Sequence, residues 1–103
     1  MLGGIRKVRE KEVEQKLVKA VKHDGGVCWK FTSPGTAGVP DRIILMPGCR
    51  IAFVEVKKPG EKPRPLQLSR HRLIRQLGFK VFVLDNTADI PKIMKEVMGD
   101  EAT

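Results

Sequence analysis

Residues 50–58, with the sequence RIAFVEVKK, constrain the fold of this chain more than any other segment. This is the most apolar strand-like run, rich in the β-branched and aromatic residues that sheets favour, yet it contains Glu55 and Lys57. Because side chains alternate between the two faces of a strand, both charged residues share one face with Ile51 and Phe53. A carboxylate and an ammonium group are costly in a buried strand unless each has a partner. We therefore expect a sheet built around this strand, with polar partners near its end.

The rest of the chain divides into helix-like and strand-like segments in the order αβββαβα. A glycine pair ends the first helix, Pro65 suits the first position of the second helix, and Gly78 suits its end. A strand, a helix and a strand near the end of the chain favour a right-handed crossover and a parallel pair, whereas the earlier strands are close enough for hairpins. We therefore expect one α/β domain over residues 1–103, a mixed four-stranded sheet flanked by helices on both faces. The expected helices cover residues 8–23, 65–77 and 88–98, and the expected strands cover residues 27–32, 42–46, 50–58 and 80–85.

The chain carries a large excess of positive charge, with a formal net charge of +8 and a pI near 9.9. In a chain this short, such an excess indicates an anionic partner, and nucleic acid is the leading class. From Lys57 to Lys80 there are eight Lys or Arg residues and one acid, Glu61. This stretch is either a solvated helix face or a surface that contacts phosphates beside a site. The DNA-contacting residues that we predict in it are Lys58, Lys62, Arg64, Arg70 and Arg75.

Cysteine spacing and hydropathy indicate the compartment. Cys28 and Cys49 form no CxxC pair and have no zinc-like spacing to His23 or His71. No apolar run approaches the roughly 18 residues that a bilayer requires, and the basic N-terminus is not followed by the apolar stretch of a signal peptide. We therefore expect a cytoplasmic protein with reduced thiols and no membrane partner.

A second acidic residue, Asp41, is expected to meet Glu55 across a hairpin. Counted from the Pro47–Gly48 turn, Asp41 lies about seven residues back and Glu55 about seven forward, so the two carboxylates fall opposite each other. Carboxylates about 4 Å apart repel by roughly 4 kcal/mol at an effective dielectric of 20, so either one is protonated or a cation joins them. Ligands that are all oxygen favour Mg²⁺, with Mn²⁺ as a substitute. Lys57 beside them can hold or deprotonate a water and stabilise phosphate charge, and the residues therefore predict a phosphodiesterase site.

Pro40–Asp41, followed by Glu55, Val56 and Lys57 on the next strand, resembles the signature of the PD-(D/E)xK nuclease superfamily. The wider context, KFTSPGTAGVPDRIIL, FVEVKKPG and PLQLSRHRLIRQLGF, is similar to the VRR-NUC family within it. The resemblance covers roughly residues 10–95 and implies a restriction-endonuclease-like core. It also implies a divalent ion bound by Asp41, Glu55 and the backbone carbonyl of Val56, with Lys57 as the catalytic lysine.

Two further positions follow from the resemblance. A glutamate of the first helix completes the family's site, often through water, and Glu14 fits best because E-x-x-L-V precedes the apolar run. Glu10, one turn earlier on the same face, is the rival. Gln67 matches a glutamine that the family places beside the site at the start of the second helix.

The resemblance also suggests substrate and assembly. Small stand-alone members resemble Holliday-junction resolvases and act as homodimers, so we expect a Mg²⁺-dependent DNA endonuclease that acts at branched DNA, encoded by a bacterium or a phage. One alternative is a DNA-binding module of this fold without useful catalysis. Another is a protein-interaction or toxin–antitoxin partner, which would need no metal and no salt-sensitive DNA binding. The candidate dimer surface is the final helix, although some of its apolar residues must pack on the sheet instead; these residues are Ile90, Ile93, Met94, Val97 and Met98.

Each single residue also has a plainer explanation. Asp41 alone could be a turn or cap residue after a proline, and Glu55 with Lys57 could be an edge-strand ion pair worth about 0–1 kcal/mol. The apolar residues around that pair argue against an edge strand. His71 is expected to be a surface helix residue rather than a catalytic base, and Trp29 to pack in the core or on a strand rather than to stack on a base.

Overall fold

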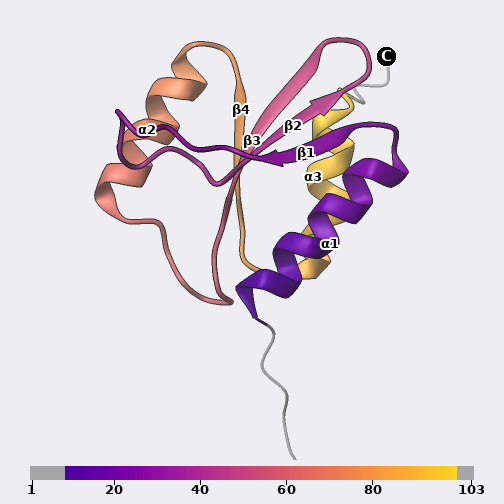
Figure 1. Ribbon diagram of the computed structural model, residues 1–103, viewed down its shortest axis with the longest axis horizontal. Coiled ribbons are helices and arrows are strands. Elements are labelled where there is room, and N and C mark those ends of the chain that lie inside the picture. Colours follow the sequence, from indigo (N-terminus) through magenta and orange to yellow (C-terminus); the bar gives the residue numbers. More distant parts are fainter. Residues whose placement is uncertain (1–8, 100–103) are drawn as a thin grey trace, which may run out of the picture.

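The computed structural model describes residues 9–99, and these form three α-helices and four strands in the order αβββαβα (Figure 1). Residue 8, where the first helix was expected to begin, lies outside the described residues. No described helix has the length and apolar character needed to cross a membrane. The elements are α1 (Glu10–His23), β1 (Val27–Lys30), β2 (Arg42–Met46), β3 (Arg50–Val56), α2 (Pro65–Gln76), β4 (Lys80–Leu84), a short 3-10 helix (Thr87–Asp89) and α3 (Ile90–Val97).

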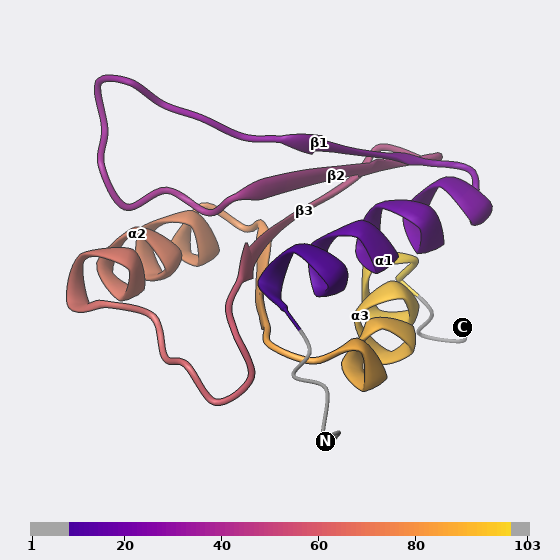
Figure 2. The same ribbon diagram turned by 60° about the horizontal axis from the view of Figure 1, so that its bottom comes forward.

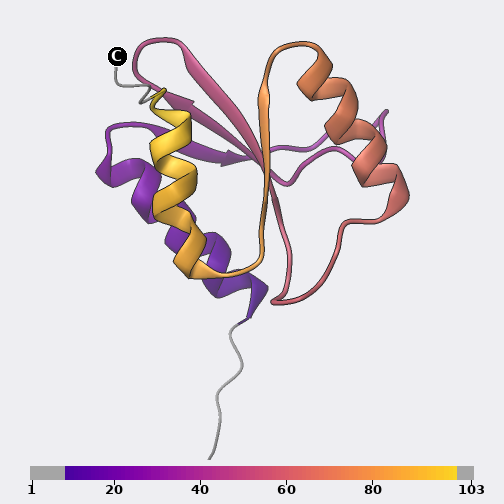
Figure 3. The same ribbon diagram turned by 180° about the vertical axis from the view of Figure 1, so that it is seen from behind.

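The strands form one mixed sheet in the order β1-β2-β3-β4. β1 pairs with β2 and β2 with β3 in antiparallel fashion, whereas β3 and β4 are parallel. α2 connects the two parallel strands, and the view from behind shows β4 running from the end of α2 towards the start of α3 (Figure 3). The α/β class and the mixed four-stranded sheet predicted from the sequence are confirmed.

α1 and α3 cover one face of the sheet, whereas α2 packs against the other face. Figure 2 shows α1 and α3 together and α2 apart from them. The two faces of β3 follow the expected alternation, because Ala52, Val54 and Val56 join the core while Glu55 contacts α2. The core under α1 and α3 contains Val13, Leu17, Val21, Ile44, Ala52, Val54, Val56, Leu84, Ile90, Ile93, Met94 and Val97.

The structure corrects two expectations about exposed surface. The apolar side chains of α3 lie in this core, so the final helix does not offer the dimer surface predicted for it; Ile90, Ile93, Met94 and Val97 are buried, and Met98 is partly buried against them. The physical reason is that a short amphipathic helix has one apolar face, and the connection after β4 places that face of α3 against the sheet beside α1. Trp29, expected to be packed, is 59% exposed on the edge strand β1, because α2 does not reach that part of the sheet.

The corner between α1 and β1 fixes where α1 lies relative to β2. Gly25 has a φ of +94°, a conformation that glycine adopts without strain. At Gly26 a Cβ would lie 2.4 Å from the Leu45 carbonyl oxygen, so only glycine permits this close approach of the corner to β2. The tight corner lays α1 along the sheet and brings its acidic first turns to the end of the sheet where β2 begins.

Candidate active site

Asp41 and Glu55 meet at the end of the β2–β3 hairpin. In the hairpin register Arg42 pairs with Val54, so the next step places Asp41 opposite Glu55. The two side chains share a hydrogen bond, and Asp41 Oδ2 also accepts one from the backbone N–H of Val56 at 2.8 Å. Glu55 is 1% exposed. The structure therefore brings together the two carboxyl groups that the hairpin count placed opposite each other.

This contact strongly perturbs Glu55. Burial is the main cause that raises the pKa of Glu55 to about 8, and the charge of Asp41 and their shared hydrogen bond raise it further. Lys57 acts in the opposite direction, because its ammonium group favours the ionised carboxylate. At neutral pH the pair holds a proton in the absence of a cation, which is one of the two outcomes that carboxylate repulsion allows.

Lys57 follows the last residue of β3 and remains attached to the sheet. Its backbone N–H donates to the Leu84 carbonyl at 2.9 Å, which continues the parallel ladder by one step. Its Nζ lies 3.8 Å from Glu55 Oε2, and the residue is 8% exposed. The ammonium group is therefore held beside the carboxyl pair by backbone pairing.

The start of α2 adds two side chains to Glu55. Gln67 Nε2 donates to Glu55 Oε2 at 3.0 Å, while Gln67 Oε1 accepts from the backbone N–H of Arg64 at 2.8 Å. Gln67 thus caps the N-terminus of α2 and hydrogen-bonds the Glu55 carboxyl with the same amide group. Pro65, at the start of the helix, fixes the backbone conformation there.

His71 does not lie on the surface as expected from the sequence. It is fully buried, and its Nε2 lies 3.2 Å from Glu55 Oε1, while its Nδ1 is buried with no hydrogen-bond partner. Burial is the main cause that lowers the pKa of His71, and the charges of Arg75 and Lys57 lower it further. The Gln67–His71 spacing of four residues, one helical turn, was the sequence signal that could have placed both on one face.

The two glutamates of α1 differ in their partners. Glu14 Oε2 accepts a hydrogen bond from Arg42 Nε at 2.7 Å, in an ion pair that is mostly buried. Burial raises the pKa of Glu10, and the charge of Asp41 is the next cause. Both glutamates line a cavity of about 260 Å³ with Asp41, together with Lys30, Phe31 and Thr32. Glu14 is thus bound to the sheet, whereas Glu10 is coupled to Asp41.

The side chains at the Asp41–Glu55 site supply only some of the oxygen ligands that a hard divalent cation needs. Within residues 9–99 no group of three or more His, Cys, Asp or Glu side chains gathers that could hold a metal ion. A cation on the Asp41–Glu55 pair therefore needs oxygen from the backbone or from water, which Mg²⁺ commonly takes. The proton retained by the pair supports this fit, because a cation would relieve the same repulsion.

The predicted DNA-contacting residues fall into two groups. Lys58, Lys62 and Arg64 are exposed in the loop from β3 to α2, next to Lys57. Arg70 Nε donates to the Ala37 carbonyl and Arg75 Nη2 to the Val81 carbonyl, each at 2.8 Å. The two arginines therefore also attach α2 to the loop between β1 and β2 and to β4.

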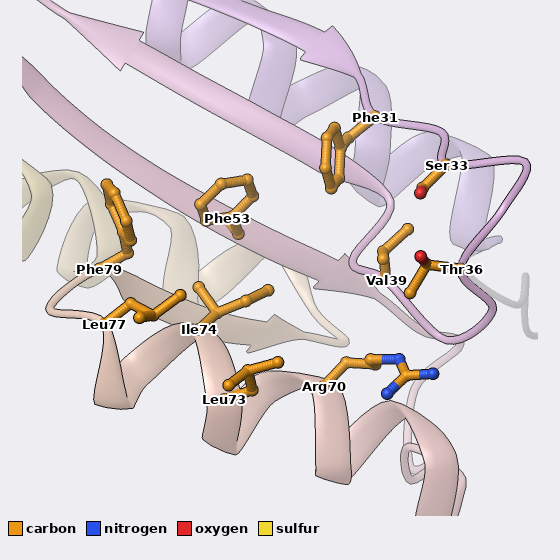
Figure 4. Close-up of a pocket in the computed structure, with 10 residues that line it drawn as sticks. All are labelled: Phe31, Ser33, Thr36, Val39, Phe53, Arg70, Leu73, Ile74, Leu77 and Phe79. Atoms are coloured by element: carbon orange, nitrogen blue, oxygen red, sulfur yellow. The ribbon is translucent and has the colours of Figure 1, made fainter.

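An apolar groove lies between α2 and the face of the sheet that α1 and α3 leave uncovered (Figure 4). Its volume is about 280 Å³, and Phe53 stacks obliquely against Phe31 and edge-on against Phe79 along it. No acidic residue lines the groove, so it cannot carry the chemistry of the carboxyl pair. Its lining residues are Phe31, Ser33, Thr36, Val39, Phe53, Arg70, Leu73, Ile74, Leu77 and Phe79.

Comparison with known proteins finds similar proteins, although no family model matches the chain. The chain is 46% identical over 93 residues to a protein of Acyrthosiphon pisum secondary endosymbiont phage 1 named "Putative nuclease p44", and the match covers 90% of this chain and 99% of that protein. Among solved structures it is similar to one described as "VRR_NUC domain", with a TM-score of 0.79 and 32% identity. That match covers 84% of this chain and 94% of the solved chain.

Proposed function

This chain belongs to the VRR-NUC family of nucleases, and from that premise we propose that it is a metal-dependent endonuclease that hydrolyses phosphodiester bonds of DNA. The observation that carries the proposal is the buried carboxyl of Glu55, hydrogen-bonded to the half-buried Asp41 beside Lys57. Such a pair is costly in a fold unless it serves a cation or a proton transfer. The combination with a basic surface favours a cation and a phosphate substrate.

Each residue of the site has a defined role in this proposal. Asp41, Glu55 and the carbonyl oxygen of Val56 would hold the ion, which would be Mg²⁺ or, as a substitute, Mn²⁺. When bound, such an ion supplies a Lewis acid that stabilises negative charge on the phosphate. Lys57 Nζ holds the attacking water and donates to the oxygen on which charge develops. Gln67 keeps the Glu55 carboxyl in place through its amide.

The glutamate that completes the site is proposed to be Glu10, which reverses the preference drawn from the sequence motif. Glu14 is hydrogen-bonded to Arg42, and a carboxylate engaged by a guanidinium is less free to bind a cation or its water. Glu10 lies in the same cavity as Asp41, whose charge raises the pKa of Glu10. A divalent cation between them would lower that pKa.

The substrate is proposed to be branched DNA, and the working unit a homodimer. The described residues contain one Asp41–Glu55–Lys57 arrangement, and one such site makes one incision at a time. Paired incisions on opposite strands of a four-way junction require two sites related by a two-fold axis, which a symmetric dimer provides. We also propose that the protein acts in a reducing cytoplasm, where Cys28 and Cys49, both free, stay unpaired.

Cleavage of labelled DNA tests the proposal directly. Four-way junction, flap and linear duplex substrates are incubated with the protein in Mg²⁺, Mn²⁺, Ca²⁺ or EDTA, and Mg²⁺-dependent incision of the junction is expected. Lys57→Met should abolish incision and leave DNA binding intact, while Lys19→Met on the exposed face of α1 serves as the matched control. Tight DNA binding without incision under any divalent ion would instead identify a DNA-binding module without catalysis.

A further inference from the structure

His71 is the buried side chain to which the proposed function gives no role. Among the described residues the buried polar or charged side chains are Glu55, Lys57, Gln67 and His71, and the first three already belong to the proposed site. A fully buried imidazole is unfavourable unless a polar group faces it. The group that faces His71 is the carboxyl of Glu55.

Gln67 and His71 together contact both oxygens of Glu55. They lie one helical turn apart on the same face of α2, with Gln67 Nε2 at 3.0 Å from Oε2 and His71 Nε2 at 3.2 Å from Oε1. The last torsion of a glutamate side chain has a broad minimum, so one contact leaves the carboxyl plane free to rotate. Two contacts from one rigid helix fix that plane.

The surroundings of His71 also define the tautomer. Nδ1 is buried without a hydrogen-bond partner, so a hydrogen on Nδ1 would be a buried donor with no acceptor. With its single hydrogen on Nε2, the neutral ring donates to Glu55 Oε1 and leaves only a lone pair at Nδ1. His71 therefore acts on Glu55 as a neutral hydrogen-bond donor.

We propose that His71 is a positioning residue, whose Nε2–H, together with Gln67, holds the Glu55 carboxyl in the orientation that faces Asp41 and a bound divalent cation. The inference rests on the proposed function, because a fixed carboxyl plane matters only if Glu55 is a ligand. Partners that orient a ligand in this way typically affect metal affinity or activity by about 10- to 100-fold when they are removed. A side chain that only fills space would have no such effect.

Binding of Mn²⁺ in the absence of DNA, followed by electron paramagnetic resonance, separates these roles. His71→Met fills the space without a donor, whereas His71→Gln places an amide N–H near the position of Nε2. We expect the first variant to weaken Mn²⁺ binding by about 10- to 100-fold and the second to bind close to wild type. Gln76→Met introduces the same side chain on the exposed part of α2 and should leave binding unchanged. Mn²⁺ titrations of DNA cleavage should show the same order of half-saturating concentrations.

Each outcome has one meaning. If His71→Met binds Mn²⁺ as tightly as wild type, His71 is a packing residue and this inference is wrong, while the proposed nuclease site stands. Should wild type bind no more tightly than Asp41→Asn, the proposed metal site fails and the inference fails with it. If circular dichroism shows that His71→Met does not fold, His71→Asn replaces it, because its shorter amide does not reach Glu55 Oε1. Equal Mn²⁺ binding by the Asn and Gln variants would then overturn the inference.

Discussion

At the scale of single residues, the polar neighbours of Glu55 have opposite effects on its pKa. Asp41 repels the ionised form of Glu55, and Lys57 stabilises it. Gln67 and His71 each contact one carboxyl oxygen, which compensates part of the hydrogen bonding to water that burial removes. The balance leaves the pKa at about 8, so a proton remains where a cation would bind.

The raised pKa of Glu55 predicts a pH-dependent stability in EDTA. Because the folded-state pKa is about 8 and the ordinary value is 4.5, the native state binds more protons than the unfolded state between these values. His71, whose pKa is lowered by burial, contributes the opposite slope below its ordinary value of 6.5, so the free energy of unfolding should fall as pH rises from about 6.5 to 8, by up to about 1.4 kcal/mol per pH unit. Glu55→Gln should flatten this dependence and should be more stable than wild type at pH 8. Denaturant unfolding at pH 6.5, 7.25 and 8 measures the slope.

The matched control for this prediction is Glu96→Gln, which neutralises an exposed carboxyl on α3 and should keep the wild-type slope. Millimolar Mg²⁺ should reduce the loss of stability at pH 8 in wild type but not in Glu55→Gln. A wild-type stability that stays level or increases from pH 6.5 to 8 would contradict the pKa assigned to Glu55.

The two α1 glutamates give a second prediction at this scale. Glu14→Gln removes the charged partner of Arg42 and should cost about 1–2 kcal/mol of unfolding free energy. Glu10→Gln removes a carboxyl that Asp41 repels, so its stability should hold or rise while cleavage falls. Thermal unfolding and single-turnover cleavage, measured on both variants, test this pair. The opposite pattern, with full stability and abolished cleavage in Glu14→Gln alone, would return the role to Glu14.

At the scale of elements, the sequence predicted which segments meet but not which surfaces they bury. The short turn at Pro47–Gly48 leaves one register for a hairpin with a buried face, so Asp41 and Glu55 could be paired by counting. Burial of α2 residues could not be derived in this way. Whether His71 is exposed depends on which face of α2 packs against the sheet, and the spacing of four residues between Gln67 and His71 was the one local signal of it. The same gap explains the exposure of Trp29.

The loop from β3 to α2 gives a prediction for DNA binding. Replacing Lys58 and Lys62 with Gln should reduce the slope of log affinity against log salt by about 0.9 for each duplex phosphate that the protein no longer neutralises. These two lysines are better probes than Arg70 and Arg75, because both arginines also hydrogen-bond to backbone carbonyls and their removal would affect folding. Fluorescence anisotropy between 50 and 200 mM salt measures the slope. Lys95→Gln on α3 should leave it unchanged, and an unchanged slope in the loop variants would exclude them from phosphate binding.

At the scale of the whole molecule, charge and apolar surface are unevenly placed. Two copies with a net charge of +8 repel each other, so their contact is favoured only where charge is sparse. The apolar groove in Figure 4 is such a place, since Arg70 is the one charged residue among those that line it. Leu73, Leu77 and Phe79 are exposed around it, with Leu77 69% exposed. This surface replaces α3 as the candidate contact of the proposed homodimer.

A charge introduced into this groove should therefore separate the dimer. In a two-fold contact each patch is used by both copies, so Leu77→Glu places two carboxylates in one apolar interface and each is desolvated there. We expect sedimentation equilibrium at micromolar concentration to show a dimer for wild type and a monomer for Leu77→Glu, with the fold retained because the side chain is exposed. Leu68→Glu, exposed on the same helix but outside the groove lining, is the control and should remain dimeric. The monomeric variant should still cut one strand of a DNA substrate at a time, because each chain keeps its carboxyl pair. It should lose the paired incision of a four-way junction. Paired incision by a strictly monomeric protein would separate junction cleavage from dimerisation and would rule out this arrangement.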